Sequence, residues 1–184
     1  MNDTVFIFHG VGGSPKENWF PWLKKELEQK GFRVIVPAFP NAEEPNQDEW
    51  LKHFERYAND VHGDTIFIGH SLGSAFALRM LELVKEPIRA AFLVGSVMGV
   101  MGNQFDHLMT TFVKGGFDWD RIRANAKQFF VCNSDNDPYI TLEKGRELAD
   151  HLHTKLRVVS GAGHFNQSSG YTSFEILKRD ILSL

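Results

Sequence analysis

The 184-residue sequence has little cysteine, no excess of positive charge and no long apolar run. Its single cysteine, Cys132, excludes an internal disulfide and a thiolate-rich zinc site. Lys and Arg total 20 against 23 Asp and Glu, so no positive excess is available to neutralise a phosphate backbone and we expect no nucleic-acid partner. No apolar run approaches the roughly 18 residues of a membrane span, and the start at Met1 lacks the features of a signal peptide. We expect a soluble, cytoplasmic protein that does not bind membranes.

What the sequence does have is an ordinary globular composition, with 42% hydrophobic and 23% charged residues. A chain of this length and composition fits one compact domain, residues 1–184, and can bury roughly 70% of its unfolded surface without a disulfide or a metal. The sequence contains no internal repeat, linker or low-complexity tract. We expect a single domain and favour a monomer.

Six short apolar runs predict the strands of a parallel sheet. They are rich in Val, Ile and Phe and are continuous rather than alternating, which is typical of strands buried on both faces. The runs are residues 5–8, 33–36, 65–68, 90–94, 128–132 and 156–159.

Segments with helical periodicity lie between the runs. Trp19, Leu23 and Leu27 are spaced at i, i+4 and i+8, after a Ser14-Pro15 start and before a helix-ending Gly31. Apolar stripes also repeat over 50–61 and 174–184, while 74–84 is apolar nearly all round and predicts a helix packed deep against the sheet. The sum is an α/β protein: a six-stranded, mostly parallel sheet with helices on both faces.

Residues 95–120 interrupt this alternation of strands and helices. They include an apolar stretch, 96–102, that is rich in Met and Gly. One interpretation is a small mobile cap or a segment that lines a pocket. The alternative is an irregular loop followed by a packed helix, since Met often fills gaps in a core.

The motif Gly69-His70-Ser71-Leu72-Gly73 matches G-x-S-x-G between a predicted strand and the buried helix. A sharp strand-to-helix turn needs small residues on both sides of the serine, because side chains there would collide with neighbouring backbone. Such a turn projects the Ser71 hydroxyl at the carboxyl edge of the sheet, beside the free N–H groups that begin the helix. We interpret Ser71 as a nucleophile; the alternative is an ordinary glycine-rich turn.

A serine hydroxyl is a weak nucleophile until a base removes its proton, so the motif predicts a histidine oriented by a carboxylate. His164 follows the last predicted strand, and Asp137 follows the strand before it. The chain order Ser, acid, His is the one expected of such a fold. Asp135 is the alternative acid, but Pro138 stiffens the turn behind Asp137, whereas Asp135 could bond the loop backbone as an Asx turn.

The loop after the first strand, residues 9–14, is the candidate source of a second oxyanion donor. We expect the backbone N–H of Val11 to pair with that of Leu72 across the substrate carbonyl oxygen. A phosphate cradle is the rival interpretation. However, Pro15 stands where G-x-G-x-x-G requires its last glycine, and the chain has no G-K-[ST].

The sequence predicts neither a metal nor a cofactor. The loop around Asp137 is no calcium loop, because counting from Asn133 or Asp135 places neither Gly at the sixth position nor Glu at the twelfth. His151 and His153 are two residues apart, a spacing that does not put them on one helix face.

Five residues are candidates for an apolar substrate pocket, and each could equally belong to the core. If they line a pocket, they favour a narrow site for a small acyl group. They are Trp19, Phe39, Met98, Met101 and Phe165.

Together these motifs resemble the small α/β-hydrolases of the YdeN and retinoblastoma-binding serine hydrolase group, over nearly the whole chain. One member of that group is named for binding a tumour suppressor through L-x-C-x-E. The residues around Cys132 depart from that pattern, so this partner is not expected here. The similarity lies in residues 9–15, 19–22, 36–41, 69–73, 134–138 and 163–165.

The resemblance implies a minimal α/β-hydrolase fold with sheet order 2-1-3-4-5-6. It also implies a triad of Ser71, Asp137 and His164, with oxyanion positions at Val11 and Leu72. Members of the group hydrolyse small esters or aminoacyl bonds, so the motifs define the chemistry better than the substrate.

We therefore predict a cofactor-independent serine hydrolase that cleaves a small acyl ester, or an amide or aminoacyl bond, through an acyl-enzyme intermediate. Its expected partner is a small-molecule acyl substrate. The same triad serves acyl transfer, thioester hydrolysis and peptide cleavage, which the sequence leaves open. The alternative from another class is a catalytically silent protein that keeps the fold as a binding module, since fold alone does not establish activity.

Overall fold

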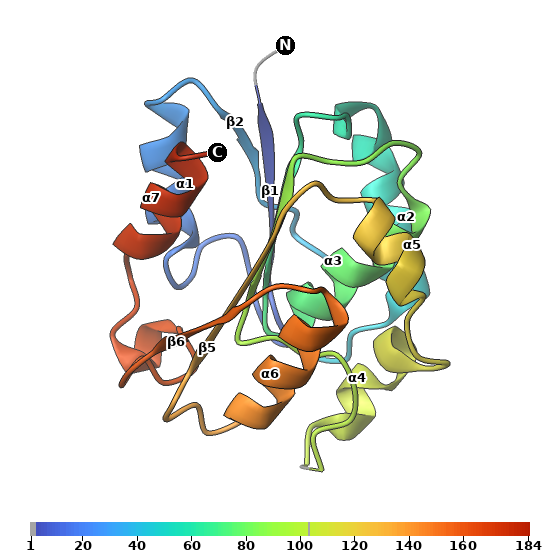
Figure 1. The fold of residues 1–184 in the computed structure, drawn as a ribbon, viewed down its shortest axis with the longest axis vertical. Coiled ribbons are helices and arrows are strands. Elements are labelled where there is room, and N and C mark those ends of the chain that lie inside the picture. The colour runs from blue at the N-terminus through green and yellow to red at the C-terminus, as the bar shows by residue number, and fades with distance from the viewer. Residues whose placement is uncertain (1–2, 103) are drawn as a thin grey trace.

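A computed structural model of the protein describes residues 3–102 and 104–184. Six strands form one sheet in the order β2-β1-β3-β4-β5-β6, and every neighbouring pair is parallel (Figure 1). This order confirms the predicted fold class. The strands are β1 (Thr4–Phe8), β2 (Arg33–Ile35), β3 (Ile66–His70), β4 (Ala90–Val94), β5 (Phe129–Ser134) and β6 (Leu156–Val159).

Helices cover both faces of the sheet. The helices α1 (Phe20–Glu28) and α7 (Glu175–Leu182) lie together on one face, and the other helices lie on the opposite face (Figure 1). A short 3-10 turn, η2 (Gln167–Ser169), precedes α7. The opposite face carries α2 (Gln47–Phe54) with its 3-10 continuation η1 (Glu55–Asp60), α3 (Leu72–Leu83), α4 (Asp106–Val113), α5 (Trp119–Ala124) and α6 (Leu142–His151).

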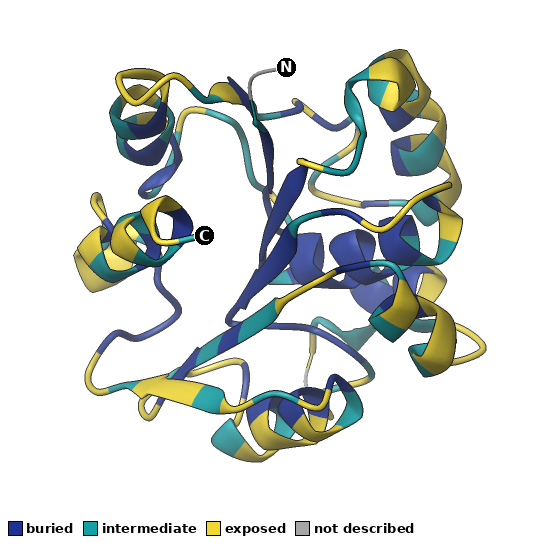
Figure 2. Ribbon diagram, turned by 45° about the horizontal axis from the view of Figure 1, so that its top comes forward, coloured by how far each residue is buried: buried dark blue, intermediate teal, exposed yellow. Residues whose placement is uncertain are grey.

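The side chains of β1 alternate between the two layers of the core. Phe6 and Phe8 pack on the α3 side, where the rings of Phe8 and Phe76 meet edge to face at 5.2 Å. Val5 and Ile7 pack with α1 and α7 on the other face. All of these residues are fully buried, and Figure 2 shows the central strands buried throughout. A continuous apolar run is therefore what a central parallel strand requires.

The edge strand β6 departs from this pattern. Its residues Arg157 and Val158 are exposed, and Figure 2 draws much of this edge strand in yellow. Burial on both faces, predicted for all six runs, is wrong for this strand because it has a neighbouring strand on one side only. At the opposite edge, β2 likewise begins with the exposed Arg33.

Helix α1 begins later than the Ser14-Pro15 pair predicts. Turns occupy the intervening residues, and Asn18 has a φ of 52°, outside the right-handed helical range. Pro21 instead lies in the first turn of the helix, where its missing N–H costs nothing. The predicted helix-ending Gly31 has a φ of 90°, as a glycine after a helix often does.

The described part of 95–120, which leaves out residue 103, contains the helix α4, the start of α5 and the irregular segments before each of them. The Asp106 carboxylate accepts hydrogen bonds from the N–H groups of Met101 at 2.7 Å and Gly102 at 2.9 Å. Met109 and Phe112 are buried in the core on the α3 face. Much of the segment thus packs on the domain, and its action as a mobile cap stays a prediction.

Candidate active site

The carboxyl ends of the strands bring the predicted loops to one edge of the sheet. Phe8 in β1 pairs with Gly69 in β3, so the loop 9–14 and Ser71 leave adjacent strands at the same level. Ser134 in β5 pairs with Val159 in β6, which places the next two loops side by side. We call residues 134–138 the acid loop and residues 160–165 the base loop.

Ser71 lies between β3 and α3 in a strained backbone conformation. Its φ of 56° and ψ of −125° lie where residues other than glycine are rare. A Cβ added to Gly69 would lie 2.5 Å from the Gly73 oxygen, and one added to Gly73 would lie 2.1 Å from the Phe8 oxygen. These close backbone approaches explain why the motif has glycine on both sides of the serine.

His164 and Asp137 are joined by a hydrogen bond of 2.8 Å between Nδ1 and Oδ2. The other carboxylate oxygen, Oδ1, accepts the N–H groups of Tyr139 at 2.8 Å and Ile140 at 3.1 Å, so both oxygens are fixed. The side chains of His164 and Asp137 are only 9% and 0% exposed. Because an ionised carboxylate only accepts hydrogen bonds, Nδ1 carries the proton and Nε2 of the neutral ring is left as an acceptor.

Asp135, the alternative acid, is directed to the backbone of the base loop. Its Oδ1 accepts the N–H of Gly161 at 2.8 Å. This bond, followed by one from the Ser160 hydroxyl, lowers the pKa of the exposed Asp135 carboxyl. The structure therefore places Asp137, rather than Asp135, beside His164.

The neighbours of Asp135 hold the base loop in the same way. Ser134 Oγ accepts the N–H of Ala162 at 3.0 Å, and Asn136 Oδ1 accepts the N–H of Gly163 at 2.7 Å. Three consecutive side chains of the acid loop thus bind three consecutive N–H groups of the base loop. The two loops form one hydrogen-bonded unit.

His70 is a second buried histidine at the site. Its Nε2 lies 2.8 Å from the carbonyl oxygen of His164, and the two rings are 5.0 Å apart. Burial, and then the neighbouring His164, lowers the pKa of His70 to about 3. His70 therefore stays neutral near pH 7 and donates its Nε2–H to the His164 carbonyl, which can only accept.

The loop after β1 lies directly against the serine. A Cβ added to Gly10 would be 2.9 Å from the Ser71 Cβ, so no larger residue fits there without a shift. Val11 and Leu72, the expected oxyanion positions, both line the cavity that contains Ser71.

This cavity has a volume of about 390 Å³ and holds both Ser71 and His164. Two carboxylates, Glu17 and Glu43, line it, and partial burial, together with the charge of Glu43, raises the pKa of Glu17. The remaining polar lining residues are Asn18, His70, Tyr139 and Asn166, and the apolar ones are Val11, Leu72, Val97, Phe105, Met109 and Ile140.

The five residues predicted to line a pocket do not line this cavity. Trp19, Phe39 and Phe165 are buried in the core, where Phe39 stacks on Trp50 at 4.3 Å. Met98 and Met101 also pack with the core. Large apolar side chains suit a core and a pocket equally, so the sequence pattern could not separate the two.

The family model for serine hydrolases matches residues 5–182. The chain belongs to the serine hydrolase family. It is 30% identical over 179 residues to YdeN of Bacillus subtilis (strain 168), across 96% of this chain and 93% of YdeN. It is 28% identical over 173 residues to the serine hydrolase RBBP9 of Rattus norvegicus, across 92% of this chain and 90% of RBBP9.

The crystal structure of the ydeN gene product from B. subtilis matches this fold with a TM-score of 0.93 at 29% sequence identity. The match covers 99% of this chain and 98% of that chain. The predicted family, the α/β-hydrolase fold and the class of esterase-like serine hydrolase are thereby confirmed.

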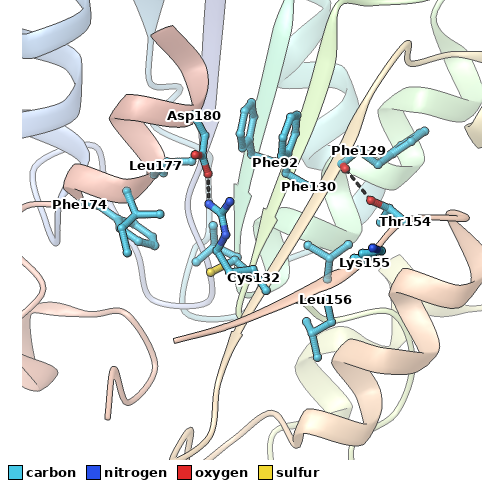
Figure 3. Close-up of a pocket in the computed structure, with 14 residues that line it drawn as sticks. Phe92, Phe129, Phe130, Cys132, Thr154, Lys155, Leu156, Phe174, Leu177 and Asp180 are labelled. Atoms are coloured by element: carbon cyan, nitrogen blue, oxygen red, sulfur yellow. Dashed lines mark hydrogen bonds and ion pairs between the residues drawn. The ribbon is translucent and has the colours of Figure 1, made fainter. Parts of the chain in front are cut away.

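This serine hydrolase has a second cavity, of about 360 Å³, between the sheet and α7 (Figure 3). The stacked rings of Phe92 and Phe130, 4.3 Å apart, lie on its sheet side. Arg157 and Asp180 also line the cavity and form an ion pair. Cys132 also lines this cavity, where burial raises the pKa of its thiol to about 12. The thiol is therefore protonated near pH 7 and is a poor nucleophile.

Within residues 3–102 and 104–184, no group of three or more His, Cys, Asp or Glu side chains is arranged to hold a metal ion. No helix within these ranges is long and apolar enough to cross a membrane.

Sequence reasoning missed the polar residues that surround the predicted triad. Ser134 and Asn136 belong to a polar run that directly follows the predicted strand 128–132, which is the signal of a functional loop, but nothing in the run separates their role from that of Asp135 and Asp137. Glu17 and Glu43 belong to no motif. They line the cavity because the chain folds back to it in the two irregular segments that carry them.

Proposed function

We propose that this serine hydrolase cleaves a small acyl ester, or an amide or aminoacyl bond, with Ser71 as nucleophile. His164 would act as the base, and Asp137 would orient it. The observation that carries the proposal is the 2.8 Å bond between His164 Nδ1 and Asp137 Oδ2, beside a strained Ser71 in the same cavity. This bond leaves His164 Nε2 as the acceptor that a serine nucleophile requires.

In the proposed reaction, Ser71 Oγ attacks the substrate carbonyl carbon while His164 Nε2 takes the hydroxyl proton. The N–H groups of Val11 and Leu72 stabilise the oxyanion that forms. The imidazolium then gives its proton to the leaving group as the carbon–heteroatom bond breaks, which leaves an acyl-enzyme on Ser71. Water, deprotonated by His164, then attacks the acyl carbon. The bond from that carbon to Ser71 Oγ breaks, the imidazolium returns its proton to Oγ, and the acid product leaves.

The cavity favours a small, uncharged or amino-bearing acyl group. Its volume of about 390 Å³ lies near the lower end of ligand pockets, which span roughly 300–1,000 Å³. The carboxylates of Glu17 and Glu43 would repel an anionic acyl group and attract a cationic one.

Labelling with a fluorophosphonate probe tests the nucleophile. The wild type should gain one covalent adduct, and Ser71→Ala should gain none. Ser168→Ala, at an exposed serine outside the cavity, is the matched control and should label like the wild type. An unlabelled wild type, or equal labelling of Ser71→Ala, would show that the assignment is wrong.

A series of nitrophenyl esters tests the substrate class and separates an enzyme from a silent binding module. Activity should peak on short acyl chains, should be poor on acyl groups that carry a carboxylate, and should disappear in His164→Ala. A peak on long acyl chains would contradict the small-acyl assignment. A complete lack of turnover in the wild type would favour the binding module.

A further inference from the structure

The base loop is also held by hydrogen bonds from residues outside the acid loop. His70 Nε2–H donates to the carbonyl of His164 at 2.8 Å. Trp19 Nε1–H donates to the carbonyl of the next residue, Phe165, at 3.0 Å. Two ring N–H groups therefore bind two consecutive carbonyls of the loop that carries His164.

The side chains that carry these two donors have little exposed surface. Trp19 is fully buried and His70 is 4% exposed. Their rings meet nearly edge to face at 6.1 Å, and the Phe20 ring lies 5.8 Å from His70 on another side. A carbonyl that loses its N–H donor in such surroundings loses the contact that fixes its direction, so each bond restricts the loop.

The loop needs this restriction because Phe165 has a φ of 51°, in the left-handed region that bulky residues rarely occupy. A strained residue of this kind persists only where its surroundings over-determine it. The N–H of Phe165 donates to Ala162 at 3.0 Å, and its ring is fully buried and stacks on Phe174 at 5.3 Å. With the Trp19 bond, these contacts fix the two peptide planes that follow His164.

We propose that Trp19 and His70 are positioning residues that set the direction of His164 Nε2 toward Ser71 through their hydrogen bonds to the base loop. The inference rests on the proposed function, because it takes His164 as the base. His70 directly precedes Ser71, so its bond ties the base to the backbone of the nucleophile itself. The low pKa of His70 supports this role, since a neutral His70 does not repel the imidazolium that forms on His164.

Trp19→Phe removes the N–H donor and keeps an aromatic ring. Its matched control is Trp50→Phe, because Trp50 is also fully buried and its Nε1–H donates to the Pro40 carbonyl at 3.0 Å, away from the base loop. Well below the melting temperatures, Trp19→Phe should lower kcat on a short nitrophenyl ester by about 10- to 100-fold, with KM within about twofold. Trp50→Phe should keep kcat within about twofold, even where its Tm falls equally. Equal kcat values for the two variants would overturn the role of Trp19.

Two variants of His70 test the second donor. His70→Leu removes the N–H group and should lower kcat by at least about tenfold. His70→Gln restores an amide N–H donor and should recover kcat to within about threefold of the wild type. If His70→Gln loses as much activity as His70→Leu, the hydrogen bond is not what His70 contributes.

A measurement independent of turnover separates this inference from the proposed function. In protein with ¹⁵N-labelled histidine, the proton between His164 Nδ1 and Asp137 should give a downfield resonance in the wild type, Trp50→Phe and His70→Gln. That resonance should shift or broaden in Trp19→Phe and His70→Leu. A wild type that neither labels nor hydrolyses esters would refute the proposed function alone. An unchanged resonance in both Trp19→Phe and His70→Leu would refute the positioning role.

Discussion

Replacing Asp137 by Asn exchanges one carboxylate oxygen for an amide NH2 and leaves the side-chain shape unchanged. Oδ1 accepts two backbone N–H groups, from Tyr139 and Ile140, so the amide oxygen must occupy that position. An NH2 group there would face two donors. The NH2 is therefore placed where Oδ2 now lies, 2.8 Å from His164 Nδ1.

A donor opposite Nδ1 requires Nδ1 to accept, which moves the ring proton of His164 to Nε2. A protonated Nε2 of a neutral ring cannot take the proton of Ser71. The same exchange in another Ser-His-Asp triad lowers kcat by about 10⁴-fold, which is about 5.4 kcal/mol at 1.36 kcal/mol per tenfold change. The Tm should change little, because the number of hydrogen bonds at Asp137 stays the same.

Spectrophotometric hydrolysis of nitrophenyl acetate, normalised to the folded fraction, measures this loss. Asp135→Asn is the control, because its amide oxygen can still accept the Gly161 N–H and kcat should stay within about threefold of wild type. Retention of more than a tenth of kcat by Asp137→Asn would refute the tautomer argument. A large loss in Asp135→Asn alone would make Asp135 the acid.

Three further outcomes are expected. Gly73→Ala should destabilise the fold by about 3 kcal/mol and lower Tm by roughly 6–12 °C, because its Cβ would lie 2.1 Å from the Phe8 oxygen. The control is Gly99→Ala, which has no atom within 4 Å of the added Cβ and should leave the Tm of a thermal melt unchanged. Phe39→Leu should lower the free energy of unfolding, measured in urea, by about 1–3 kcal/mol and leave KM unchanged, because Phe39 is in the core. A changed KM would show that Phe39 contacts the substrate. Burial holds the pKa of His70 near 3 in the folded chain. Between about pH 6.5 and pH 3 the unfolded chain therefore binds a proton on His70 that the folded chain lacks. The free energy of unfolding should fall by up to about 1.4 kcal/mol per pH unit as the pH is lowered through this range. Urea titrations at pH 7, 6 and 5 should show a shallower fall in His70→Gln, and an equal slope would contradict the assignment.

The sequence predicted the parts of this molecule that depend on short-range signals. The strands stand out because each central run is buried on both faces, and the turn at Ser71 stands out because backbone contacts require glycine on either side. The order of the sheet came from the resemblance to a family, since apolar runs do not record which strands become neighbours.

What the sequence could not predict depends on register and direction. Phe39 and Trp19 look alike as apolar residues, yet one stacks in the core and the other donates a hydrogen bond to the base loop. The hydrogen bonds that Ser134 and Asn136 accept from the base loop require β5 and β6 to pair in one register, which no local pattern encodes. The predicted start of α1 was wrong because the backbone at Asn18 does not adopt right-handed helical geometry.

The base loop follows β6, the edge strand whose residues Arg157 and Val158 are exposed, whereas Ser71 follows the fully buried β3. Edge elements with few buried contacts open locally at a lower free-energy cost than central strands. Local opening of β6 would withdraw His164 while Ser71 and the loop after β1 stay folded. Loss of activity on heating should therefore precede loss of the fold. Trp19 and His70 tie the base loop to more deeply buried elements. They therefore also set the difference in temperature between loss of activity and loss of the fold.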